Sequence, residues 1–282
     1  MCKIITVANQ KGGVGKTTIC QHLSYIMAEQ GRRVLCVDFD PQMNLSSSLL
    51  SECQSPIKNI HNLMLCLLED CELPNIEGHI QHCGKVDLLP GSKDLARLEV
   101  SLLTEMGTER FLQEILSPLR ASYDYIIIDT NRAVSPLMTN ALTVADSVLI
   151  PLCPEFYSTE GLGDLIRSVL KNKRRLNPDI TFEGIVFSRC NLRTNLYRST
   201  RTNVEKAYYS AVRVFQSAIP DTVKVGDAIS RGLTVMEYAP DSKASTAYRA
   251  FAKELMEHDT QTAATEGSTI HILPDCGTRR VG

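Results

Sequence analysis

The chain alternates short apolar runs with longer stretches that have helical character. Seven runs of strand length, rich in Val and Ile, occupy residues 4–8, 34–37, 86–89, 125–128, 148–152, 185–187 and 214–219. Such nearly continuous apolar runs are typical of parallel strands that are covered on both faces. Helices are predicted at 17–30, 94–104, 109–119, 160–173 and 245–257, and Gly31 ends the first. The alternation predicts a doubly wound α/β fold, with a mostly parallel sheet and helices on both faces.

The length and the end of the chain suggest how it divides. With 282 residues, 43% of them hydrophobic, the chain is long enough for one large domain with a substantial core. Beyond residue 258 the sequence becomes polar and small, which is typical of flexible termini. We therefore expect one domain over 1–258 and a flexible tail over 259–282.

Targeting signals and cysteine content indicate the cellular compartment in which the protein is expected. No export signal is seen, and no apolar stretch reaches the roughly 18 residues of a membrane span, so we expect a cytoplasmic protein without membrane contact. In a reducing cytoplasm the ten cysteines stay free. One cluster has the residue types of a zinc site, although it has no Cys-x-x-Cys pair and matches no standard module: His61, Cys66, Cys71, His79, His82 and Cys83. The favoured interpretation is that these residues are scattered over helices and loops and bind no metal, and a zinc site is the alternative.

A glycine-rich segment follows the first predicted strand and leads into the first predicted helix. Gly12, Gly13 and Gly15 allow backbone amides to curl around anionic oxygens, and the helix N-terminus adds a favourable dipole. Lys16 is expected to reach the β- and γ-phosphates, and Thr17 to ligate Mg²⁺. The ordinary pattern has glycine where this chain has Gln10. The segment predicts an ATP and Mg²⁺ site formed by Lys11, Gly12, Gly13, Val14, Gly15, Lys16, Thr17 and Thr18.

Carboxylates follow two of the predicted strands. Asp38 and Asp40 come after the run at 34–37, and Asp129 follows the run at 125–128. A carboxylate at the carboxyl end of a strand lies beside the crevice where open α/β sheets bind ligands. An Asp that ends a buried strand needs a cation or hydrogen-bond donors. We therefore expect Asp129, with Thr17, to serve the metal.

The loop 11-KGGVGKT-17 and the element 38-DFDPQ-42 resemble those of the ParA/MinD family of deviant Walker-A ATPases, and the similarity continues over about 1–257. The resemblance implies that Lys11 crosses the interface of an ATP-sandwich homodimer to touch the partner's nucleotide. It also implies a catalytic set of Lys11, Lys16 and Asp40, in which Asp40 positions the attacking water and Asp38 supports the Mg²⁺ shell. Late strands line adenine in this family, which makes Pro220 and Arg189 expected contacts.

The chain departs from the family pattern after Asp129. The family usually continues with a proline-containing pair, whereas this chain has Asn131 and Arg132. The change falls in the second switch, so it puts in doubt how hydrolysis is coupled to partners. Arg132 is interpreted either as a solvated side chain, the favoured option, or as a phosphate contact.

Branches of the family differ in cargo. The MinD branch carries a basic amphipathic C-terminal helix on membranes, and no such stripe follows Asp259. Nitrogenase-reductase relatives need two cluster-binding cysteines, and none lies between Asp129 and Leu152, although Cys153 follows. ParA proteins bind DNA non-specifically as ATP-loaded dimers, and a ParB-like partner stimulates their hydrolysis.

The charge distribution favours the ParA branch. The net charge is −2, but residues 185–231 hold eight basic and three acidic residues. Lys and Arg that neutralise phosphates give sequence-independent affinity, so these residues are expected to bind DNA: Arg189, Arg193, Arg198, Arg201, Lys206, Arg213, Lys224 and Arg231. A merely solvated helix face is the alternative. We expect a nucleoid-associated ATP hydrolase that segregates plasmids or chromosomes, the alternative being a related ATPase that positions a protein cargo or regulates another process.

Overall fold

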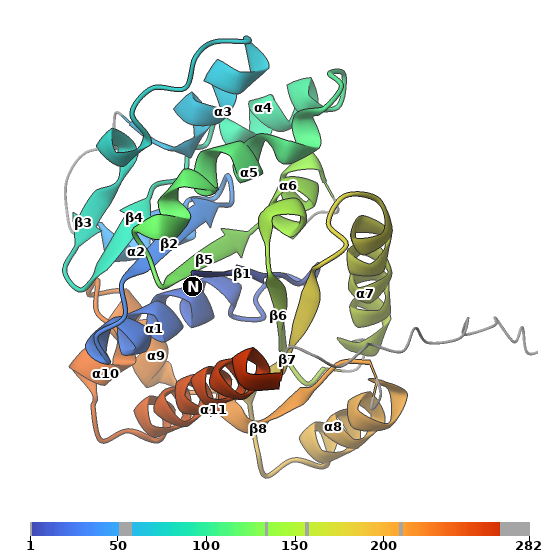
Figure 1. The fold of residues 1–282 in the computed structure, drawn as a ribbon. Helices are drawn as coiled ribbons and strands as arrows, with labels where there is room; N and C mark the ends of the chain where they lie inside the picture. The colour runs from blue at the N-terminus through green and yellow to red at the C-terminus, as the bar shows by residue number, and fades with distance from the viewer. Residues whose placement is uncertain (1, 51–57, 133–134, 156–157, 209–210, 266–282) are drawn as a thin grey trace, which may run out of the picture.

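The computed structural model describes residues 2–50, 58–132, 135–155, 158–208 and 211–265 (Figure 1). The strands are β1 (Lys3–Val7), β2 (Val34–Phe39), β3 (Gln81–Cys83), β4 (Val86–Leu89), β5 (Tyr125–Thr130), β6 (Ser147–Leu152), β7 (Thr181–Cys190) and β8 (Val214–Pro220). The α-helices are α1 (Lys16–Glu29), α2 (Asn44–Leu49), α3 (Ile60–Leu68), α4 (Leu95–Leu102), α5 (Phe111–Leu116), α6 (Pro136–Val144), α7 (Ser158–Arg175), α8 (Asn195–Tyr208), α9 (Val223–Ile229), α10 (Val235–Tyr238) and α11 (Lys243–Thr265). Short 3₁₀ turns cover Ile76–His79, Thr108–Arg110 and Pro118–Ala121.

One eight-stranded sheet runs through the protein in the order β3-β4-β2-β5-β1-β6-β7-β8. Seven strands are parallel, and β3 alone pairs antiparallel, with β4. The strand order reverses around β1, with β5 on one side and β6 on the other. The predicted doubly wound α/β fold is confirmed, and each of the seven predicted runs forms a strand.

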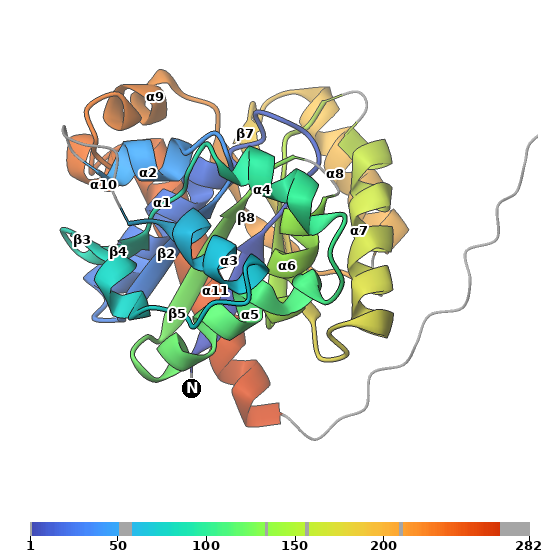
Figure 2. The same cartoon turned by 90° about the horizontal axis from the view of Figure 1, so that it is seen from above.

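Alternating side chains of the strands supply the cores on the two faces of the sheet. In β1, Ile5 and Val7 pack with α1, α10 and α11, whereas Ile4 packs with α3 to α6. A third cluster joins α7 and α8 to β6 and β7. The two views show the sheet enclosed between these helical layers (Figures 1 and 2). Among the described residues no helix combines the length and apolar character that a membrane crossing needs.

The last helix extends further than the sequence indicates. The predicted helix ended at 257, but α11 continues to Thr265, so the expected boundary at 258 falls inside it. Asp259 is anchored to β1 and β5, because it accepts hydrogen bonds from Lys3 and from the Tyr125 hydroxyl, the latter at 3.0 Å. Small polar residues thus prolong the helix where a tail was expected. The rest of the predicted tail, 266–282, lies outside the described residues.

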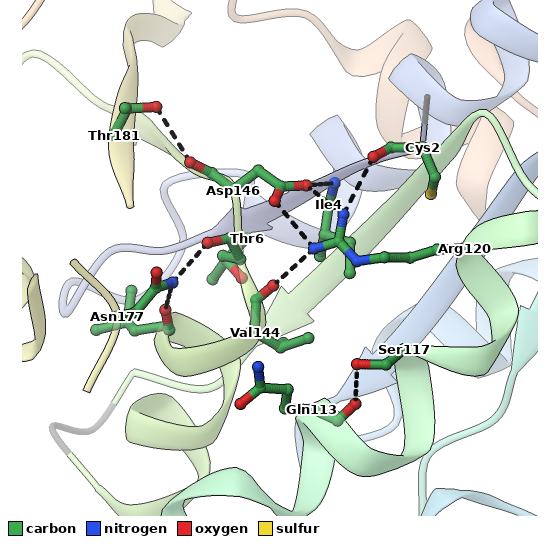
Figure 3. Close-up of polar contacts among 12 residues, drawn as sticks. Cys2, Ile4, Thr6, Gln113, Ser117, Arg120, Val144, Asp146, Asn177 and Thr181 are labelled. Atoms are coloured by element: carbon green, nitrogen blue, oxygen red, sulfur yellow. Dashed lines mark hydrogen bonds and ion pairs between the residues drawn. The ribbon is translucent and has the colours of Figure 1, made fainter. Parts of the chain in front are cut away.

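A network of polar contacts ties the amino end of the sheet to the helices (Figure 3). The Arg120 guanidinium donates to both carboxylate oxygens of Asp146, each at 2.9 Å, and also to the Cys2 carbonyl at 3.1 Å. Asp146 Oδ2 accepts from the amide of Ile4 at 2.7 Å. Bidentate pairing of this kind fixes geometry as well as supplying attraction, so it holds the start of β1 beside β6.

Candidate nucleotide-binding site

The phosphate loop joins β1 to α1 at the carboxyl edge of the sheet. Gly13 and Gly15 adopt left-handed backbone conformations, with φ of 74° and 85°, which residues with a Cβ rarely tolerate. Helix α1 begins directly afterwards at Lys16, whose buried ammonium donates to the Asn9 carbonyl at 3.1 Å. The first amides of α1 therefore point out of the helix end that the loop encloses, as an anion site requires.

Asp129 reaches the loop from the neighbouring strand β5. The register of the sheet places Val7 of β1 opposite Asp129, and the Thr17 hydroxyl donates to Asp129 Oδ2 at 2.6 Å. The other oxygen, Oδ1, is buried without a hydrogen-bond partner among the described residues. Burial, followed by repulsion from Asp38, raises the Asp129 pKa from 3.8 to about 8.

This pair of side chains fits a magnesium ion. A hydroxyl and a carboxylate are oxygen ligands of the type that Mg²⁺ prefers, and a buried carboxylate oxygen without a donor is stabilised by a cation. Thr17 and Asp129 are thus the residues that could hold the metal, directly or through water.

Asp38 lies near the end of β2, beside Asp129, and is held by the segment that follows the strand. Its Oδ2 accepts from the Ser46 amide at 2.7 Å and from the Ser46 hydroxyl at 2.6 Å. Its Oδ1 accepts from the Asp40 amide at 3.3 Å. Burial raises its pKa to about 6, although the bonds from Ser46 lower it. Both oxygens thus support the segment after β2 that carries Asp40, and the expected role of Asp38 in the Mg²⁺ shell stays a prediction.

The loop residues and Asp40 line a cleft of about 1000 Å³. Asp40 is 8% exposed, and its Oδ1 accepts from the Gln42 amide at 2.9 Å, which orients the carboxylate. Ile219, Pro220 and Tyr248 also line the cleft. A cleft that combines phosphate-binding amides and a lysine with apolar side chains has the composition expected of a nucleotide site.

Two arginines, Arg189 and Arg132, line this cleft. The sequence suggested a phosphate contact at this site for Arg132 only as the less favoured option, and none for Arg189. Arg189 donates to the Gly13 carbonyl at 2.8 Å and pairs with Asp221 at 3.5 Å. Arg132 lines the cleft too, although its side chain is exposed. The solvated interpretation and the phosphate-contact interpretation of Arg132 are thus compatible.

The additional lysine of the loop has a partner within the chain. Lys11 Nζ lies 2.5 Å from Glu155 Oε2, and its side chain is 34% exposed. Glu155 follows β6, the strand beside β1, so the contact spans the edge of the sheet. In the single chain Lys11 therefore faces Glu155, and its expected contact with a partner's nucleotide stays a prediction.

The eight arginines and lysines expected to bind DNA fall into separate groups. Arg189 belongs to the nucleotide cleft. The Arg201 guanidinium bonds to Glu205 and to the Phe215 carbonyl, and Arg213 bonds to Glu254 and lies over the Phe215 ring. Because these guanidinium groups are engaged inside the chain, we remove Arg201 and Arg213 from the expected surface. The exposed members are Arg193, Arg198, Lys206, Lys224 and Arg231.

Known proteins resemble the chain over most of its length. A family described as an AAA domain matches residues 2–182. The sporulation initiation inhibitor protein Soj of Bacillus subtilis is 36% identical over 255 residues, which cover 90% of this chain and 98% of that protein. The chromosome partitioning protein ParA of Myxococcus xanthus is 37% identical over 258 residues, which cover 92% of this chain and 89% of that protein.

A solved structure matches the fold as well. Cobyrinic acid a,c-diamide synthase from Mycobacterium smegmatis, with bound ADP and magnesium, superimposes with a TM-score of 0.79 at 31% identity, over 93% of this chain and 97% of that one. The similarities extend well beyond the phosphate loop, and they include the strands that carry Asp40 and Asp129. The chain therefore belongs to the ParA/MinD family of deviant Walker-A P-loop ATPases.

Proposed function

We propose that this chain is a ParA-type ATPase, which binds ATP with Mg²⁺, dimerises around the nucleotide and binds DNA non-specifically. With a ParB-like partner it would segregate plasmids or chromosomes, as a cytoplasmic protein on the nucleoid. The observation that carries the proposal is the cleft lined by Lys16 and Thr17, with Asp129 bonded to Thr17, beside a loop that bears Lys11. The names of the Bacillus and Myxococcus relatives support the partitioning role.

The residues of the cleft have distinct tasks in this proposal. Lys16 neutralises the β- and γ-phosphates, while the metal, when bound by Thr17 and Asp129, neutralises further charge on the same oxygens. Asp40 orients the attacking water. Phosphoryl transfer requires mainly positioning and charge neutralisation, and these groups supply both.

Lys11 would act as the dimerisation switch. In the single chain its ammonium is paired with Glu155, so dimerisation has to exchange that partner for a phosphate of the second subunit's ATP. A ligand that binds only the joined state shifts the equilibrium toward it. ATP would thus hold two chains together, and hydrolysis would release them.

The proposed DNA surface uses the exposed basic residues on both sides of β8. Arg193, Arg198 and Lys206 lie on or before α8, while Lys224 and Arg231 lie on or after α9. The views show α8 and α9 apart, on opposite sides of β8 (Figures 1 and 2). A dimer would double these charges, and affinity for DNA rises steeply with the number of phosphates neutralised.

The test is binding to random-sequence duplex DNA, measured by fluorescence anisotropy with a non-hydrolysable ATP analogue and with ADP. We expect binding with the analogue only, and weakening with salt. Replacing both Arg193 and Arg198 by Ala should reduce the log–log salt slope by about 0.9 for each lost phosphate contact and per subunit. Arg97→Ala on α4, whose side chain is 91% exposed, is the matched control and should change nothing.

The Lys11→Ala variant is measured in the same DNA-binding experiment, and its oligomeric state is measured by sedimentation. It should still bind the analogue as a monomer, yet lose both the dimer and the DNA. Unchanged turnover of the variant would contradict the role in the partner's site. If the wild type binds no DNA at low salt, the DNA proposal fails. The second candidate, an ATPase acting on a protein cargo or in small-molecule chemistry, would then be favoured, and the Mycobacterium relative bears the name of a small-molecule synthase.

A further inference from the structure

Arg132 lies directly over the phosphate loop. It stands three residues after Asp129, where the family usually has a proline-containing pair. A Cβ placed on Gly12 would overlap one terminal guanidinium nitrogen of Arg132 and lie 2.6 Å from its Cζ, so the guanidinium uses the space that glycine leaves open. The guanidinium is therefore packed against the backbone of the loop, although the side chain is exposed.

The charge around Arg132 is not balanced by a nearby carboxylate. No ion pair involving Arg132 is found among the described residues, whereas Arg189, across the same loop, is paired with Asp221. A second cation, the Lys16 ammonium, lines the same cleft. Two cations that share a cleft are stabilised by an anion bound between them.

The position along the cleft indicates which part of a nucleotide this anion is. The Thr17–Asp129 hydrogen bond marks the metal side of the loop, and Arg132 belongs to the segment that follows Asp129. In P-loop ATPases the metal bridges the β- and γ-phosphate oxygens. The apolar lining formed by Ile219, Pro220 and Tyr248 belongs to a different part of the chain and suits the base. Arg132 is thus placed at the terminal-phosphate end.

We propose that Arg132 binds the γ-phosphate of ATP from within the same chain, and so makes the site discriminate ATP from ADP. Arginine suits this role because its planar fork donates two hydrogen bonds to a phosphate and stays charged. The inference depends on the nucleotide binding proposed above and is independent of DNA, dimerisation and partner. It also gives the unusual pair at 131 and 132 a task, which is to carry a charge to the loop in place of proline.

The experiment compares the affinities of a non-hydrolysable ATP analogue and of ADP, both with Mg²⁺, by isothermal titration. Wild type, Arg132→Ala and Arg132→Lys are compared, with Arg97→Ala as a surface control of the same charge change. We expect Arg132→Ala to weaken the analogue about tenfold, which corresponds to about 1.4 kcal/mol, and ADP less than about twofold. Arg132→Lys should retain part of the discrimination, because a point charge remains without the fork.

The outcomes separate this inference from the proposed function. If Arg132→Ala weakens both nucleotides equally, or neither, the γ-phosphate role is overturned while ATP binding stands. If the wild type binds neither nucleotide, the proposed ATPase fails and this inference with it. Thermal melts of each variant show whether the fold is retained. Should Arg132→Ala unfold, Arg132→Lys decides: a partial or complete loss of the discrimination between the analogue and ADP supports the inference, and discrimination equal to that of the wild type overturns it.

Discussion

Buried carboxylates are neutralised by the chain itself at one end of the central sheet and not at the other. At the carboxyl end, Asp38 and Asp129 lie side by side, Asp129 Oδ1 has no donor among the described residues, and the Asp129 pKa is raised to about 8. At the amino end, Glu183 is equally buried, and its Oε1, 3.8 Å from His258 Nδ1, likewise accepts no hydrogen bond among the described residues. Its Oε2, however, accepts from the Ser147 hydroxyl at 2.7 Å and pairs with the Lys3 ammonium at 2.5 Å, whereas no ion pair of Asp129 is found among the described residues. The Glu183 pKa is about 2, because these groups and His258 outweigh the effect of burial.

This difference distinguishes a carboxylate that binds a ligand from one that stabilises the fold. Glu183, His258 and Asp259 are close enough together to resemble a metal site. However, the Lys3 ammonium pairs with both Glu183 and Asp259, so the positive charge that the cluster needs comes from the chain itself. At the phosphate loop the chain leaves that charge to be supplied by a ligand. A buried carboxylate therefore suggests function only where its own fold does not satisfy it.

The largest effect is expected at the amino end. Glu183→Gln replaces the ion pair with Lys3 by a neutral amide and leaves Lys3 paired with Asp259 alone, which costs roughly 1.5–3 kcal/mol of the free energy of unfolding. Because the Glu183 pKa is lowered in the fold, from 4.5 to about 2, its stabilisation is complete above about pH 4.5 and is lost as the pH falls toward 2. Urea titrations across this range would measure both, and nucleotide affinity should be unchanged. If the variant and the wild type have equal free energies of unfolding at pH 7, Glu183 does not stabilise the fold and the contrast with Asp129 fails.

A smaller loss is expected for the network in Figure 3. Arg120→Ala removes the bidentate pair to Asp146 and the bonds to the carbonyls of Cys2 and Val144. The side chains of Arg120 and Asp146 are 34% and 41% exposed, so solvent screening limits the cost to about 1–2 kcal/mol. Thermal denaturation would measure it. Arg97→Ala, which breaks an exposed pair to Asp94, should change stability by less than about 0.5 kcal/mol and is the control.

The smallest effect has the opposite sign. Because the Asp129 pKa is raised, its ionised form destabilises the ligand-free fold as the pH rises from 3.8 toward 8. Asp129→Asn should therefore stabilise the ligand-free protein at pH 7 by about 1 kcal/mol, while it loses the additional stabilisation that Mg²⁺ and ATP give the wild type. Melts with and without Mg²⁺ and ATP measure the two effects. A destabilised apo variant would show that Asp129 is a structural group, like Glu183.

Local pattern was enough for most of the sheet and for the loop. The seven apolar runs became strands, since parallel strands covered on both faces must be apolar throughout. Strand β3 was missed because Gln81–Cys83 is short, polar and partly exposed at the edge of the sheet. Helix α11 was cut short because its last turns are polar, and their anchoring through Asp259 depends on Lys3, 256 positions away.

The sequence could not show which partner each charged side chain contacts. Arg201 has an i+4 partner, Glu205, that local spacing could have indicated, but Arg213 pairs with Glu254, 41 residues away. Arg132 and Gly12 are 120 positions apart, and their contact appears only once β5 lies beside β1.

The sequence by itself determined the phosphate loop, because Gly13 and Gly15 set its backbone and Lys16 opens the helix that follows. It also determined the strand content, because side-chain polarity is a local property. Tertiary structure alone decided which charges are neutralised. Asp38 accepts from Ser46, Glu183 pairs with Lys3 and Arg213 pairs with Glu254, whereas Asp129 has a buried oxygen without a donor and no ion-pair partner among the described residues. Electrostatic energy depends on distances through space, and these are established only when strands and helices distant in the chain pack together.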